Sequence, residues 1–103
     1  MSAADAIRVL LSKEGEYWVA QCLEYDIGAQ AHDLGELRKR LLVAIQAERD
    51  ESLRRHGKPF AGIGPAPQQF HDRWLRRAGE FRPVHPAVVT DAPDIAIEFG
   101  LAA

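Results

Sequence analysis

The sequence predicts an α+β domain, a mainly antiparallel sheet with one long helix packed on one of its faces. Two observations support this fold class. Apolar residues recur at steps of three and four positions over residues 33–56, which is the period of an amphipathic helix. Near both ends of the chain apolar and polar residues alternate, which is the period of a half-buried strand. The expected order is three strands, the long helix, a short helix and a last strand, in a single domain of 103 residues.

The first part of this pattern is a three-stranded unit. Residues 6–12 alternate as a strand, and residues 13–16 form a polar connection whose Gly15 can take the positive φ that a hairpin turn needs. Residues 17–23 return as a second strand that is rich in aromatic and β-branched side chains. Apolar residues occupy both faces of this strand, so we expect it to be central or to carry an interface on its second face. Residues 27–31 form a short third strand.

Capping residues mark both ends of the long helix. Asp33 can accept hydrogen bonds from the first free backbone N–H groups, and Glu36 completes a variant of the capping box. Residues 54–56 place cations at the negative end of the helix dipole, and Gly57 can take the left-handed cap conformation. A single helix cannot bury its apolar stripe alone, so the strands should form the surface that it covers, with a core over residues 6–56. The stripe consists of Leu34, Leu37, Leu41, Leu42, Ala44 and Ile45.

The second half of the chain is less regular. Residues 57–67 contain three glycines and three prolines, a density of helix and strand breakers that predicts a loop. A shorter helix is expected over residues 67–78, with a proline at its first helical position and Gly79 as its cap. Residues 83–93 form a proline-rich crossing. Residues 94–101 alternate as a C-terminal strand that should return to an edge of the sheet or pair with another copy of the chain.

The composition restricts the classes of function. The single cysteine, Cys22, excludes an internal disulfide and favours a reducing compartment, with the cytoplasm as the expectation. No run approaches the roughly 20 apolar residues of a membrane span, and the N-terminus lacks the layout of a signal peptide. The four histidines lie on separate segments without the spacing of metal ligands, and the glycines of residues 57–64 do not form a phosphate loop. We therefore expect no enzyme, no catalytic or metal-binding residue and no cofactor.

Charge is unevenly distributed along the chain. Residues 1–33 carry six acids and two bases, residues 34–82 carry eleven bases and six acids, and residues 83–103 carry three acids with no lysine or arginine. The basic part is either the solvated surface of two helices or a surface for an anionic partner, RNA or an acidic protein face. An RNA-binding site would stack on and neutralise a single strand with Arg73, Trp74, Arg76 and Arg77.

Acidic residues mark both ends of the second predicted strand, namely Glu14, Glu16, Glu24 and Asp26. These are either solvated loop charges or a docking edge for a basic protein. The aromatic residues beside them are of the type that anchors interfaces, although Trp18 can equally belong to the core. We therefore predict a partner-binding surface at Trp18, Glu24, Tyr25 and Asp26.

A family pattern runs through the same segment. Residues 17–27 read Tyr-Trp-Val-Ala-Gln-Cys-Leu-Glu-Tyr-Asp-Ile, and residues 29–31 read Ala-Gln-Ala before the capped helix. This resembles the HicB-like antitoxin family, in which a strand ends in a Cys-Leu-Glu-x-Asp-like turn and leads through a short strand into a helix that begins Gly-x-Ser/Thr-x-x-Glu-Ala. The resemblance covers about residues 6–56, roughly half of the chain.

Three positions depart from the family pattern: His32 stands for the glycine, Asp33 for the Ser/Thr cap, and Leu37 for the alanine. Asp33 and Glu36 keep the capping chemistry, so the expectation of a HicB-like fold stands. Many family members also carry a C-terminal helix–turn–helix or ribbon–helix–helix module that binds operator DNA. Residues 57–103 lack the paired helices of such a module.

The resemblance implies a non-enzymatic protein that binds and neutralises a small basic RNA-cleaving toxin, or an orphan that has lost its toxin. It also implies a homo-oligomer, a dimer or a tetramer. The alternative function is an RNA-binding module that uses residues 34–82. A third hypothesis, an enzyme on a ribonuclease-H-like sheet, ranks last because its candidate carboxylates Glu24, Asp26 and Asp33 have structural explanations as turn and cap residues.

Overall fold

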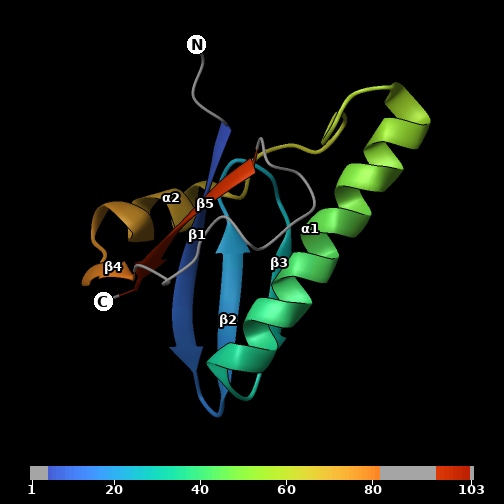
Figure 1. Cartoon of the computed structure of the whole chain (residues 1–103). Helices are drawn as coiled ribbons and strands as arrows, with labels where there is room; N and C mark the ends of the chain where they lie inside the picture. Colours follow the sequence, from blue (N-terminus) through green and yellow to red (C-terminus); the bar gives the residue numbers. More distant parts are fainter. Residues whose placement is uncertain (1–4, 82–94, 103) are drawn as a thin grey trace.

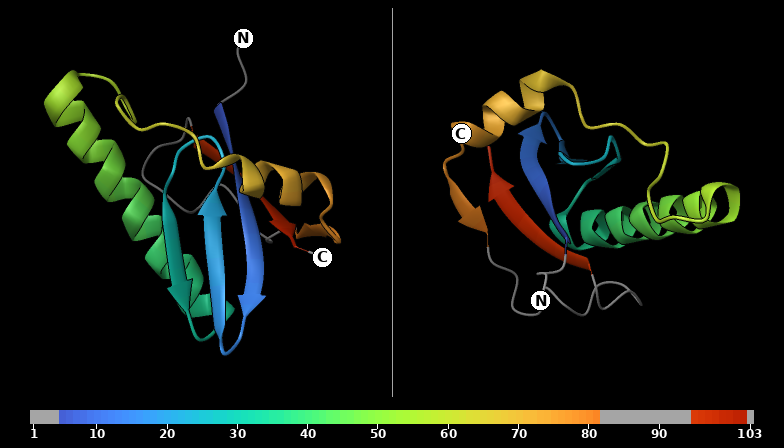
Figure 2. Two further views of the ribbon diagram at one scale, coloured as in Figure 1. Left: turned by 180° about the vertical axis from the view of Figure 1, so that it is seen from behind. Right: turned by 90° about the horizontal axis from the view of Figure 1, so that it is seen from above.

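A computed structural model describes residues 5–81 and 95–102, with the side chains of residues 7–78 and 97–102. It confirms the α+β class. The sheet has five strands in the order β3-β2-β1-β5-β4, with α1 over one face and α2 over the other (Figures 1 and 2). The elements are β1 (Asp5–Glu14), β2 (Tyr17–Cys22), β3 (Gly28–Ala31), α1 (Leu34–His56), α2 (Gln68–Leu75), β4 (Gly79–Phe81) and β5 (Ile95–Leu101).

Three of the four strand pairings are antiparallel, as the sequence predicts, and the fourth is parallel. β1 and β2 form a hairpin whose turn contains Gly15 at a φ of 64°. The parallel pairing joins β1 to β5, with Val9 opposite Phe99. The C-terminal strand therefore pairs with the sheet of its own chain. β2 lies between β3 and β1, which is the first of the two alternatives that the sequence left open for this strand.

The long helix α1 has both predicted caps. The Glu36 backbone N–H donates to the Asp33 carboxylate at 2.7 Å, which satisfies one of the free donors of the first turn. At the other end Gly57 has a φ of 75°, and its N–H donates to the Leu53 carbonyl at 2.9 Å. The inward-facing residues Leu37, Leu41 and Ile45 are buried.

The region after α1 differs from the prediction in three respects. Pro67 is the N-cap of α2 rather than its first helical residue, because its extended ψ of 150° is not helical. α2 ends at Leu75 with Arg76 as its C-cap, and Gly79 belongs to a strand, β4, that the sequence pattern did not indicate. The physical reason is pairing with β5, to which the chain is already joined at Ala78, whose N–H donates to the Leu101 carbonyl at 2.8 Å. A prolonged helix would prevent this pairing. The expected crossing over residues 83–93 lies outside the described residues.

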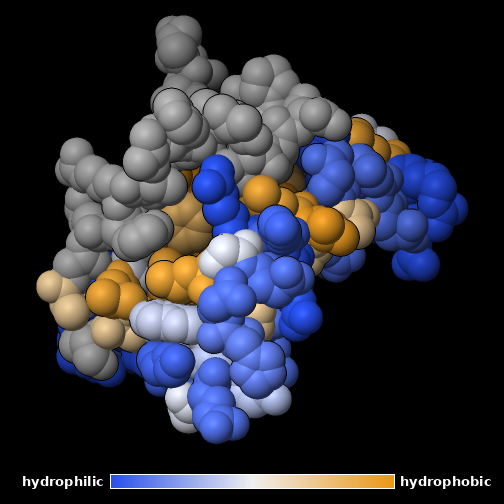
Figure 3. Space-filling view, turned by 60° about the horizontal axis from the view of Figure 1, so that its bottom comes forward, coloured by the Kyte–Doolittle hydropathy of each residue, from blue (hydrophilic) through white to orange (hydrophobic). Residues whose placement is uncertain are grey.

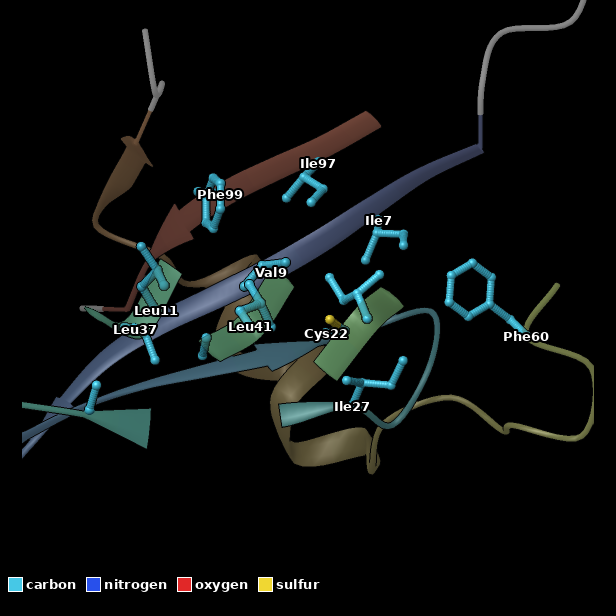
Figure 4. Packing of buried hydrophobic residues seen from close by; sticks show 13 residues of the cluster. Ile7, Val9, Leu11, Cys22, Ile27, Leu37, Leu41, Phe60, Ile97 and Phe99 are labelled. Carbon is cyan, nitrogen blue, oxygen red and sulfur yellow. The ribbon is translucent and has the colours of Figure 1, made fainter. Parts of the chain in front are cut away.

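The two faces of the sheet bury two separate cores. On the α1 side, residues of β1, β2, β5 and α1 form the larger core (Figure 4). It includes Ile7, Val9, Leu11, Ala20, Cys22, Leu37, Leu41, Ile45, Ile97 and Phe99. On the α2 side, a smaller core consists of Leu10, Leu23 and Trp74, with Phe70 and Ala102 packed against it. α1 packs over β3 and β2, whereas α2 packs over β1.

The smaller core depends on a glycine. A Cβ atom placed on Gly100 would lie 2.6 Å from Cζ3 of the Trp74 ring and 2.7 Å from Cδ of Arg77. These distances are shorter than van der Waals contact, so the indole of Trp74 can lie on the sheet only because β5 carries no side chain at this position.

We expect Gly100→Ala to lower the free energy of unfolding by roughly 1–3 kcal/mol, because the added methyl group displaces the ring of Trp74. Urea denaturation measures the change. Gly64→Ala is the matched control, because a Cβ there meets no atom within 4 Å, and we expect a change within about 0.5 kcal/mol. Equal effects of the two substitutions would contradict the role assigned to Gly100.

Candidate functional site

The structure does not bring the four predicted partner-binding residues together. Trp18 lies near the start of β2, whereas Glu24, Tyr25 and Asp26 follow its end. A strand rises about 3.3 Å per residue, so Trp18 and Glu24 are roughly 20 Å apart, at opposite ends of the sheet. The four residues therefore belong to two separate places.

Three of the four side chains, those of Trp18, Glu24 and Tyr25, make contacts with other parts of the chain. Trp18 is half-buried and packs against the larger core, with the Lys13 ammonium 5.3 Å from its ring centroid. Glu24 accepts hydrogen bonds from the Arg8 backbone N–H at 2.7 Å and from the Arg8 Nε at 2.5 Å. The Tyr25 ring stacks on Phe60 with a centroid distance of 4.4 Å. These contacts fasten the turn after β2 to β1 and to the loop that follows α1.

Asp26 is the residue of this set that remains exposed. Its backbone N–H donates to the Gly64 carbonyl at 2.8 Å, which fixes the turn. Its carboxylate accepts a hydrogen bond from Nε2 of Gln21 at 3.0 Å. Asp26 is therefore held in place and still available to a partner.

The residues proposed for RNA binding do not form a stacking platform. The side chain of Trp74 is 5% exposed, and the guanidinium groups of Arg77 and Arg8 lie 4.5 Å and 5.9 Å from its ring centroid. Arg73 lies 3.5 Å from the Glu14 carboxylate, and Arg76 is exposed. Because a base stacks on an exposed ring face, this arrangement does not favour single-strand binding by Trp74.

The cations of α1 are largely neutralised by carboxylates on the same helix. Arg40 pairs with Glu36 at 3.3 Å. Arg54 and Arg55 both pair with Glu51, and their hydrogen bonds hold the pKa of that carboxyl below its usual range. Hydrophilic side chains cover the outer surface of α1 and the hairpin end of the sheet (Figure 3). Part of the positive charge of residues 34–82 is therefore paired with carboxylates on α1.

An excess of negative charge remains in the segment that contains β2 and β3. Residues 14–37 contain six acids and no lysine or arginine. Three of the acids have an arginine within 4.0 Å, namely Glu14, Glu24 and Glu36. Among the described residues, no lysine, arginine or histidine lies within this distance of the other three, which are Glu16, Asp26 and Asp33. β2 and β3 therefore carry uncompensated negative charge at both ends.

The α2 side of β2 and β3 forms an open face, which we define as Tyr17, Val19, Gln21, Gln30 and His32. No other described element lies in front of these strands (Figure 2, left). Tyr17 is 41% exposed, Gln30 and His32 are exposed, and Val19 and Gln21 are half-buried. The rings of Tyr17 and His32 are in contact, with a centroid distance of 4.5 Å. The hydrogen bond from Gln21 places Asp26 at one end of this face.

Sequence reasoning placed apolar residues on both faces of the second strand but did not assign either face to solvent. The available signal was the run of residues 14–37 without a base, together with apolar residues on both faces of β2. His32 and Gln30 could not be assigned to the same face without the register of β3 on β2, in which Val19 lies opposite Gln30.

The structure places the cysteine and the carboxylates that the sequence analysis weighed for chemistry. The Cys22 thiol is buried in the larger core. No group of three or more His, Cys, Asp or Glu side chains within residues 7–78 and 97–102 could hold a metal ion. Asp33, which caps α1 at the hairpin end of the sheet, lies far from Glu24 and Asp26 at the other end. The carboxylates of the ribonuclease-H-like hypothesis are therefore not clustered.

Comparison of the chain with models of known protein families, with curated protein sequences and with solved structures gave no match. In the part of the chain that the structure describes, no helix combines the length and apolar character needed to cross a bilayer.

Burial, and to a smaller extent the charge of Glu24, raises the pKa of the Cys22 thiol from 9.0 to about 12. The thiol ionises more readily in the unfolded chain. The buried, protonated thiol therefore contributes fully to the free energy of unfolding below pH 9.0. This contribution is lost as the pH rises toward 12. Above pH 9.0 we expect the free energy of unfolding of the native chain to fall with pH more steeply than that of Cys22→Ala. Urea denaturation at a series of pH values measures both slopes, and equal slopes would contradict the assignment.

Proposed function

We propose that this chain is a non-enzymatic protein-binding domain of the HicB antitoxin type, which binds and neutralises a small basic RNA-cleaving toxin. The observation that carries the proposal is a set of three carboxylates at the ends of β2 and β3, Glu16, Asp26 and Asp33, that have no cation within 4.0 Å among the described residues. A basic protein is attracted to such a surface, whereas the phosphates of RNA are repelled by it. The turn after β2, the short strand β3 and the capped helix α1 follow one another in the order of the pattern that the sequence resembles, which supports the proposal.

We also propose a compartment, an oligomeric state and the absence of a cofactor. The single cysteine is a buried thiol in the core, which fits a reducing compartment such as the cytoplasm. We also propose that the chain forms a homo-oligomer, as the resemblance implies. No cofactor is part of the proposed function, because masking the active site of a toxin needs only a complementary surface.

The first test is an affinity purification of the tagged chain from its native host, with and without nuclease treatment. We expect a small basic protein that is retained after nuclease treatment and that cleaves RNA when it is separated from this chain. Recovery of RNA alone, lost at moderate salt concentration, would move the function to the RNA-binding alternative.

The second test uses the purified pair. We expect Glu16→Lys with Asp26→Lys to lower the association rate constant about tenfold at low ionic strength, because the local attraction is reversed. Asp33 is left unchanged because its carboxylate caps α1. Glu48→Lys with Asp50→Lys on α1 is the control with the same change in net charge. If the control slows association equally, net charge rather than the sheet carboxylates governs binding.

A further inference from the structure

The open face combines an uncharged centre with a charged border. Its five side chains, Tyr17, Val19, Gln21, Gln30 and His32, include an aromatic pair and two amides but no carboxylate, lysine or arginine. Asp26 borders this centre at one end through its hydrogen bond with Gln21. Glu16 precedes Tyr17 and Asp33 follows His32 at the other end. Protein interfaces have the same anatomy, a centre depleted in charge and enriched in tyrosine within a polar rim.

We propose that the open face is the surface on which a basic protein docks, with the Tyr17–His32 pair at the contact and Glu16, Asp26 and Asp33 at its rim. This inference rests on the proposed function and assigns its contact surface. Glu16, Asp26 and Asp33 have no cation within 4.0 Å among the described residues, and Asp33 also accepts the Glu36 N–H at the start of α1. A partner with lysine or arginine near Glu16 and Asp26 supplies the missing charge.

A second copy of the chain fits this face less well. Symmetric packing of the open face on itself brings the same anionic rim of two protomers together, and like charges across an interface are unfavourable. RNA meets the same repulsion. The charge of the border therefore selects a basic protein over both other occupants.

The contact uses the face of the sheet rather than its edge. β3 is an edge strand of four residues, and Nη1 of Arg40 donates to the Gln30 backbone carbonyl at 2.9 Å. This side chain from α1 occupies an acceptor that an added strand would need. Pairing of a partner strand with β3 is therefore obstructed, while the side chains of the open face remain accessible.

Site-specific photo-crosslinking in the native host tests the assignment. A photoreactive amino acid replaces Gln30 on the open face in one variant of the full-length chain, and Val43, which is 70% exposed on α1, in the other. We expect an adduct with a basic protein from position 30 and not from position 43. We also expect Glu16→Lys with Asp26→Lys to lower the yield of that adduct, because the charge reversal slows association. The crosslinked protein is then produced separately for binding measurements.

With that protein in hand, we expect Gln30→Arg to weaken binding about tenfold, because it places a cation against a basic partner. Val43→Arg is the matched control, and we expect a change of less than about twofold from this exposed helix position. Circular dichroism melting of both variants establishes that they are folded.

The other outcomes separate the two proposals. A basic protein crosslinked only at position 43, or binding that Gln30→Arg leaves unchanged, would overturn the open face as the contact and leave the proposed function intact. An adduct of two copies of the chain at position 30 would assign the face to self-association and overturn the inference. If neither position nor affinity purification yields a basic protein, the proposed function and this inference both fail.

Discussion

The parallel pairing of β5 with β1 is the contact on which the rest of the arrangement depends. It joins residues 5–11 to residues 95–101 and places Gly100 opposite Leu10. The missing side chain of Gly100 gives the indole of Trp74 room to lie on the sheet, and Leu10 and Leu23 complete the small core. The same strand pairs with β4 on its other side. One long-range pairing therefore determines where α2 lies and where the sheet ends.

The position of α2 in turn determines which part of the sheet remains exposed. Trp74 ties α2 to β1 and β5, so the helix cannot also cover β2 and β3 on that side. On the other side α1 packs over β3 and β2, where Leu37, Leu41 and Ile45 are buried. β2 and β3 are thus covered on one face only. The open face is a direct consequence of two helices that are offset across the sheet.

Local signals in the sequence were sufficient for α1 and for the hairpin. The caps at Asp33 and Gly57 and the turn at Gly15 depend on neighbouring residues only, and each has the expected conformation. β4 and the end of α2 depend on a partner strand that lies about twenty residues further along the chain, so local patterns missed them. The same limit applies to the candidate site. Glu24 looked available in the sequence, yet it binds Arg8, sixteen residues away in the chain.

The carboxylates described here form two groups, which differ in whether the neutralising cation lies on the same element or on another one. On α1, acids and bases three or four residues apart pair with each other, because the helix brings them together whatever the rest of the fold does. Residues 14–37 contain no lysine or arginine, so an acid in this segment is neutralised only where another element reaches it, as Arg8 reaches Glu24 and Arg73 reaches Glu14. Glu16, Asp26 and Asp33 lie beyond such contacts.

In the proposed complex these three charges govern the rate of encounter, and salt lowers that rate because it screens their attraction for the partner. The uncharged centre around Tyr17 governs how long the partner stays, because affinity differences between related interfaces arise mostly in dissociation.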